Sequence, residues 1–229
     1  MSQHLKTRHE ELEASITHGL GFILSMLAFG LLLNMASVYN NPVLLGLCII
    51  YAMTLTMVYA ASTLSHMHTF QHIKPLLRRC DQGFIYLLIV GSATPFMYFL
   101  LSSDATMMTG LTISIVLWTL ALAGCISKIV FAHRLNNVDI TLYLLLGWGE
   151  AISLLLIQPL LPQSIMNFML LGGILYSIGT VFLVLDWSKY HFHTIWHLLV
   201  MAGSIAHFHA IILLLLHANT PSTPISDYN

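Results

Sequence analysis

The sequence predicts an all-α integral-membrane protein, a bundle of seven transmembrane helices with the N-terminus inside and the C-terminus outside. Of its 229 residues, 57% are hydrophobic and 7% are charged, whereas an ordinary soluble domain is about 25% charged. The mean hydropathy is +0.82, and apolar runs of about 20 residues, the length that crosses a bilayer as a helix, recur along the chain. The formal net charge of -1 and the absence of a basic tract exclude nucleic acid as a partner.

The seven expected helices follow one another with turn residues between them. The breaks contain Asn, Ser, Asp and Pro, which end helices and form turns. The segment 1–15 is expected to be a short cytoplasmic segment, 16–217 the transmembrane domain, and 218–229 a flexible extracytoplasmic tail. The helices are expected over residues 16–37, 42–65, 82–101, 106–131, 138–158, 163–185 and 194–217.

The positions of the cations predict the orientation. In a seven-helix topology all eight Lys and Arg residues fall on one side of the membrane, and positive charge is retained in the cytoplasm. This orientation is opposite to that of G-protein-coupled receptors, and the last helix has no lysine to hold retinal. The cations are Lys6, Arg8, Lys74, Arg78, Arg79, Lys128, Arg134 and Lys189.

Polar residues that can bind a metal cluster at the predicted inner face. His193 and His197 form an HxxxH pair, which places two imidazoles on one face of a helix. His66 ends the second helix and can supply a third ligand, while Asp81 opens the third helix and can orient a water. Three imidazoles and one open position are the arrangement of catalytic zinc, which lowers the pKa of bound water to about 7. The alternative is that these histidines only meet lipid headgroups.

The other polar residues are weaker candidates. His207 is too far from His197 to share one ion and is expected to bond within the bundle. His18 lies near the same inner face, in a supporting or a packing role. Glu150 lies deep in the fifth helix, as a functional group or as a protonated, hydrogen-bonded acid. A solvated position is expected for three loop histidines, His68, His72 and His191.

Four motifs follow one another along the chain: EASITHGLG (13–21), STLSH (62–66), DQGFIYLLIVGSATPF (81–96) and HTIWHLLVMAGSIAHFHAI (193–211). Together they resemble the hemolysin III branch of the progestin and adiponectin receptor family. In that family and in the related alkaline ceramidases, these motifs form a zinc site near the cytoplasmic face. The resemblance implies that His66, His193 and His197 bind zinc, that Asp81 holds the zinc-bound water, and that Ser62 supports it.

Two classes of function stay open at this point. One is a zinc hydrolase that cleaves an amide or ester bond of a membrane lipid at the inner leaflet and so adjusts membrane lipid composition. The other is a non-enzymatic membrane protein, either a lipid sensor with a structural zinc or a pore-forming cytolysin. The expected partners are membrane lipids, with a fatty acid or ceramide-like ligand, and the expected location is the bacterial cytoplasmic membrane.

Overall fold

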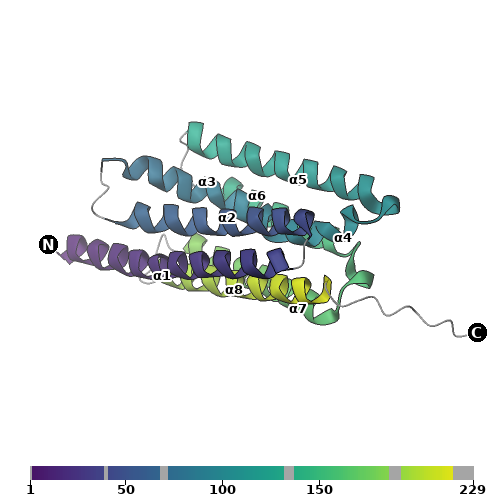
Figure 1. The fold of residues 1–229 in the computed structure, drawn as a ribbon. Helices are drawn as coiled ribbons and strands as arrows, with labels where there is room; N and C mark the ends of the chain where they lie inside the picture. Colours follow the sequence, from purple (N-terminus) through teal and green to yellow (C-terminus); the bar gives the residue numbers. More distant parts are fainter. Residues whose placement is uncertain (1, 39–40, 68–71, 132–136, 186–191, 219–229) are drawn as a thin grey trace, which may run out of the picture.

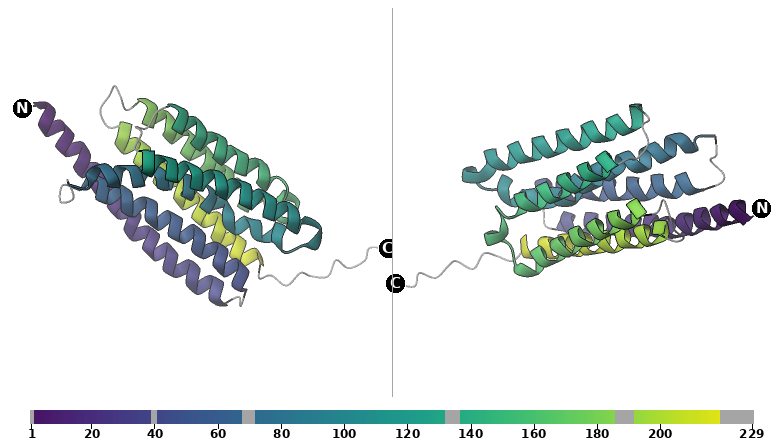
Figure 2. Two further views of the ribbon diagram at one scale, coloured as in Figure 1. Left: turned by 90° about the horizontal axis from the view of Figure 1, so that it is seen from above. Right: turned by 180° about the vertical axis from the view of Figure 1, so that it is seen from behind.

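The protein is a bundle of roughly antiparallel helices, seen lengthwise in Figure 1 and from two further sides in Figure 2. The structure, a computed structural model, describes residues 2–38, 41–67, 72–131, 137–185 and 192–218. Within these residues every regular element is a helix. The all-α prediction is therefore confirmed.

Eight α-helices and two short 3₁₀ segments make up the described chain. They are α1 (Ser2–Val38), α2 (Pro42–His66), α3 (Lys74–Ala93), η2 (Thr94–Phe96), α4 (Met97–Leu101), α5 (Asp104–Phe131), α6 (Asn137–Leu154), η3 (Gln158–Leu160), α7 (Gln163–Leu185) and α8 (Phe192–Ala218).

Six stretches of the described chain are long and apolar enough to cross a membrane. One of them, Lys74–Leu101, is formed by α3, η2 and α4 in succession. The 18-residue helix α6 is not among the six, and it carries two acids, Asp139 and Glu150. It nevertheless lies alongside the other helices and completes a bundle of seven. Because the count is odd, α1 begins at one end of the bundle and α8 ends at the other (Figure 1).

Some helices begin or end away from the expected residues. The first helix begins at Ser2 and not near residue 16, because the intervening Lys, Arg and Glu residues are good helix formers and neither Gly nor Pro interrupts them. The third begins at Lys74 and not at 82, with Pro75 in its first turn, where its missing N–H is tolerated. The fifth ends at Leu154, four residues earlier than expected, before the 3₁₀ turn that contains Pro159.

The packing places α3 near the centre of the bundle. It contacts α2, α5 and α6, while α1 packs on α2 and α8, and α7 packs on α8. The sequence GSATP (91–95) fixes the packing of α3 on α2 and interrupts the span. A side chain at Gly91 would overlap the Thr54 hydroxyl of α2, and Pro95 lies in the 3₁₀ segment that interrupts the span.

The described cations lie at the end of the bundle where α1 begins. Lys128, which the sequence places near a loop, is fully buried and forms an ion pair with Asp139 of α6 at 2.8 Å. Arg134 and Lys189 lie outside the described residues. The orientation of this end toward the cytoplasm stays a prediction.

Candidate metal centre

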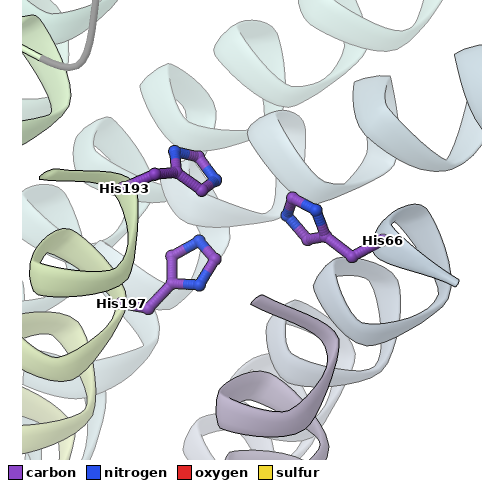
Figure 3. A group of neighbouring side chains, drawn as sticks. All are labelled: His66, His193 and His197. Atoms are coloured by element: carbon purple, nitrogen blue, oxygen red, sulfur yellow. The ribbon is translucent and has the colours of Figure 1, made fainter. Parts of the chain in front are cut away.

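Three histidines from α2 and α8, which are far apart in the sequence, meet at the end of the bundle where α1 begins. His66 is the last residue of α2, and His193 and His197 lie in the first two turns of α8. One ligand atom from each lies within 4.8 Å of the other two. The rings point into one space between the two helices (Figure 3), with ring centroids 4.3 Å apart for the α8 pair and 5.4 Å from His66 to each partner.

This donor set fits zinc. A tetrahedral zinc ion with Zn–N bonds of about 2.05 Å holds its nitrogens about 3.4 Å apart. Small rotations of the three side chains bring nitrogens that lie within 4.8 Å to that separation. Imidazole is also a ligand that zinc accepts readily.

Hydrogen bonds from α1 orient two of the three rings. His66 Nδ1 lies 3.2 Å from Glu11 Oε2, and because a carboxylate only accepts, Nδ1 donates and Nε2 keeps its lone pair. His197 Nδ1 lies 3.4 Å from Thr17 Oγ1. The Thr17 hydroxyl donates to carbonyls of its own helix, so it accepts from His197. In both rings Nε2 is left to bind a metal, the arrangement in which an outer partner fixes the tautomer of a ligand.

Glu11 is the functional residue that sequence reasoning missed. Its carboxylate also binds Lys74 Nζ and Arg78 Nη2, each at 2.8 Å. Its spacing is a signal in the sequence, because Glu11 lies seven residues before His18, which is two helical turns along one face. The prediction that residues 1–15 precede the first helix hides this signal, since the spacing has meaning only if the helix includes Glu11.

Asp81 lies beside the three histidines but is not part of their ligand group. The Ser65 hydroxyl lies 3.4 Å from Asp81 Oδ2, and Ser62 is a second hydrogen-bond donor to this carboxyl group. Among the described His, Cys, Asp and Glu residues, only the three histidines converge closely enough to be grouped as metal ligands here. The arrangement therefore has three ligands and an adjacent carboxyl group.

His18 is in direct contact with the centre. Its ring centroid lies 3.8 Å from that of His197, edge to face, and its side chain is buried. Neither of its ring nitrogens has a hydrogen-bond partner among the described residues. The neighbouring Glu13 accepts a hydrogen bond from Thr194, which ties α1 to the start of α8.

A cavity of about 550 Å³ extends from the histidines into the bundle. Its walls come mainly from α3, α6, α7 and α8, and they are largely apolar. Asp81, His193 and His197 line one end, Glu150 and His207 line it further in, and Gln158 and Gln163 line the far end.

The remaining predicted histidines are placed as follows. His207 bonds within the bundle as expected, with Nε2 3.1 Å from the Met169 carbonyl. His72 is exposed, as expected for a solvated residue. His68 and His191 lie outside the described residues.

Comparisons with known proteins identify the family of this chain. A family model described as haemolysin-III related matches residues 6–208. The chain belongs to the haemolysin-III-related family. It is 35% identical to the hemolysin-3 homolog of Bacillus subtilis (strain 168) over 207 residues, which cover 90% of this chain and 94% of that protein. It is 34% identical to hemolysin-3 of Bacillus cereus over 217 residues, 94% of this chain and 95% of that protein.

A more distant relative links the chain to the progestin and adiponectin receptor family. The human monocyte to macrophage differentiation factor is 26% identical over 168 residues, which cover 73% of this chain and 66% of that protein. The resemblance that the four motifs indicated is thus confirmed, and this haemolysin-III-related protein is a multi-pass membrane protein.

Proposed function

We propose that this protein is a zinc-dependent membrane hydrolase that cleaves an amide or ester bond of a membrane lipid at the inner leaflet. The observation that carries the proposal is the convergence of three imidazoles, with a carboxyl group beside them, at the end of a long apolar cavity. The role that follows is the adjustment of membrane lipid composition. The two Bacillus relatives support a bacterial cytoplasmic membrane as its location.

The number of ligands favours catalysis over a structural role. Structural zinc sites normally have four protein ligands, whereas catalytic sites have three and an open position. Only three histidines make up the ligand group in the described chain, and Asp81 lies outside it. Zinc held in this way supplies a Lewis acid and lowers the pKa of water at its open position.

The protein's own residues then handle the proton and the orientation. Asp81 is placed to accept a proton at Oδ1 or Oδ2 and to pass it to the leaving group. Ser65 and Ser62 donate to this carboxyl group and so fix its direction. Glu11 and Thr17 hold the rings of His66 and His197. The site is therefore organised before a substrate enters it.

The cavity defines the class of substrate. Its volume lies within the range of about 300–1,000 Å³ that is usual for ligand sites, and long-chain molecules suit its apolar walls. Several wall residues, such as Ile152 of α6 and Leu170 of α7, are also exposed on the outer surface of the helices, where lipid surrounds the protein. A lipid with its carbonyl group at the histidines and its hydrocarbon chain along the cavity matches both the polar end and the apolar walls.

The test is release of fatty acid by the purified full-length protein. The zinc-loaded protein, the chelator-stripped protein and the protein with zinc restored are incubated with long-chain ceramides and membrane phospholipids in bilayers, and released fatty acid is measured by mass spectrometry. We expect release that zinc removal abolishes and zinc addition restores. If the loaded protein releases no more than the stripped one from any lipid in the panel, the hydrolase proposal fails and a lipid sensor with a stapling zinc takes its place.

A further inference from the structure

Two buried polar side chains lie in the cavity away from the histidines. Glu150 of α6 is 4% exposed and His207 of α8 is 6% exposed, and both line the cavity. Glu150 Oε1 and His207 Nδ1 have no hydrogen-bond partner within the described chain. Buried polar groups without partners are costly and rare in folded proteins, so each calls for a ligand that satisfies it.

The two side chains lie at a similar depth. The helices α6 and α8 begin at the same end of the bundle (Figure 1). Glu150 lies about 20 Å along α6 and His207 about 22 Å along α8, at 1.5 Å per residue. Both therefore lie at a similar distance from that end of the bundle, and both line one cavity.

The surroundings of His207 define what its free nitrogen can do. Its Nε2 donates to the Met169 carbonyl, so in the neutral ring Nδ1 is an acceptor. The ring is seated against α7 by Gly172, because a Cβ atom at that position would overlap the imidazole. The orientation of His207 is thus fixed by packing and by one hydrogen bond, while Nδ1 still lacks a donor.

Two serines that also line the cavity are already engaged. Ser92 donates to the Ile89 carbonyl, and Ser177 accepts from Trp148 Nε1 at 3.2 Å and donates to the Gly173 carbonyl. Glu150 has no ion pair with any described cation, and an isolated carboxylate in this setting is expensive. A protonated carboxyl group offers one donor and one acceptor.

We propose that Glu150 and His207 form a second recognition site, specific for a hydroxyl group borne in the middle of a long lipid chain. This inference rests on the proposed function, because it places the head of the same lipid at the three histidines. The chain hydroxyl donates to His207 Nδ1 and accepts from the carboxyl group of Glu150. A neutral hydroxyl meets both needs without bringing a charge into the membrane.

The spacing along the cavity defines the position of the hydroxyl. His207 lies ten residues beyond His197 on α8, about 15 Å along the axis. In an extended chain, atoms three bonds apart are separated by about 3.8 Å, so 15 Å corresponds to about 12 bonds. The preferred ligand is therefore a fatty acyl chain with a hydroxyl group near its twelfth carbon.

The experiment compares three fatty acids of equal length. Stearic acid, 12-hydroxystearic acid and 2-hydroxystearic acid compete with radiolabelled stearic acid for the zinc-loaded, full-length protein in nanodiscs. We expect 12-hydroxystearic acid to bind about 5- to 10-fold more tightly than stearic acid, the contribution of a hydrogen bond between neutral groups. The 2-hydroxy isomer should show no such gain, because its hydroxyl lies at the other end.

Two variants and one control assign this gain to the proposed residues. His207→Leu removes the acceptor together with the hydrogen bond to the Met169 carbonyl, and Glu150→Leu removes the carboxyl group. In both, the 12-hydroxy acid should lose its advantage over stearic acid, because its hydroxyl keeps only one of its two hydrogen-bond partners. Ser92→Ala is the control at a similar depth, since its hydroxyl is engaged, and it should keep the preference.

The outcomes separate this inference from the proposed function. Undiminished stearic acid binding shows that each variant is folded. If the wild type binds stearic acid but does not favour the 12-hydroxy acid, or if both variants keep the preference, the second site is wrong and the lipid cavity stands. If the wild type binds none of the three acids, the proposed occupant of the cavity and this inference are both overturned.

Discussion

Buried polar groups differ between two regions of the molecule: the histidine end of the cavity, where His193 and His197 line it, and the middle of the cavity. At the histidine end most polar groups have partners: His66 donates to Glu11, and Glu11 forms ion pairs with Lys74 and Arg78. Asp81 likewise receives hydrogen bonds from serines of α2. In the middle, Glu150 Oε1 has no hydrogen-bond partner in the described chain, and His207 has one nitrogen with a partner and one without.

The difference indicates two kinds of site. A ligand cage must hold its geometry before the metal arrives, and outer hydrogen bonds provide that order. A site that recognises a polar group of the ligand keeps its own donors and acceptors unpaired until the ligand binds. The ligand-free protein is less stable because these buried groups lack hydrogen bonds. The largest effects of substitutions are therefore expected at the histidine end of the cavity, and smaller effects in its middle.

The largest effect should follow from removing a ligand. His193→Ala and His197→Ala should each abolish the retention of zinc, which the wild type should hold at about one ion per chain, because two imidazoles bind far more weakly than three. Zinc in the purified proteins is measured by elemental mass spectrometry. Both variants should also melt at a lower temperature, since the ion ties α2 to α8. Unchanged zinc in both variants would show that the site is elsewhere.

Removing the base should stop the chemistry while the metal stays. Asp81→Asn preserves the size and hydrogen bonding of the side chain but cannot accept the proton, so fatty acid release should fall about 100-fold or more. Its zinc content should match the wild type. Asp104→Asn, an exposed acid at the opposite end of the bundle, is the control and should leave both quantities unchanged. Loss of zinc in Asp81→Asn would make Asp81 a direct ligand and favour the stapling role.

A smaller effect is expected from the outer support. Glu11→Gln weakens the hold on His66 without touching the metal, so zinc affinity should fall by about 10- to 100-fold, as for other partners of metal-bound histidines. Competition with a calibrated chelator measures it, with Asp104→Asn again as control. An affinity equal to that of the wild type would mean that Glu11 only anchors α1 to the basic start of α3.

The sequence predicts where the candidate site residues lie more accurately than where the helices begin and end. Helical spacing and the topology predict that Ser62, His66, Asp81 and the HxxxH pair share one end of the bundle, and they do, while their roles stay predictions. Glu11 was missed because a charged segment does not show, from composition alone, that it continues the first helix. The burial of Lys128 could not be predicted from the sequence either, because it depends on an ion pair with Asp139, which lies on the next helix.

The sequence predicts only part of the site in the middle of the cavity. Because Glu150 is an acid within an apolar span, the sequence predicts either a functional group or a protonated, hydrogen-bonded acid. The structure shows no hydrogen bond to it within the described chain. His207 was expected to bond within the bundle, and it does so through one nitrogen. That its other nitrogen faces no partner depends on the packing of α7 against α8, which spacing along one helix does not reveal.

The smallest effect compares two acids of the same helix. Glu150→Leu removes an unpartnered buried polar group, so the ligand-free protein should become more stable by about 1 kcal/mol, which is a rise of about 2–4 °C in Tm for a chain of this size. Its zinc content should not change, because Glu150 does not contact the three histidines.

Asp139→Leu is the matched comparison. It leaves the buried Lys128 without its ion-pair partner and should destabilise the protein by about 3–5 kcal/mol. Thermal unfolding of delipidated protein in one detergent measures both. If Glu150→Leu lowers Tm as Asp139→Leu does, Glu150 is a structural acid and the contrast between the two regions is wrong.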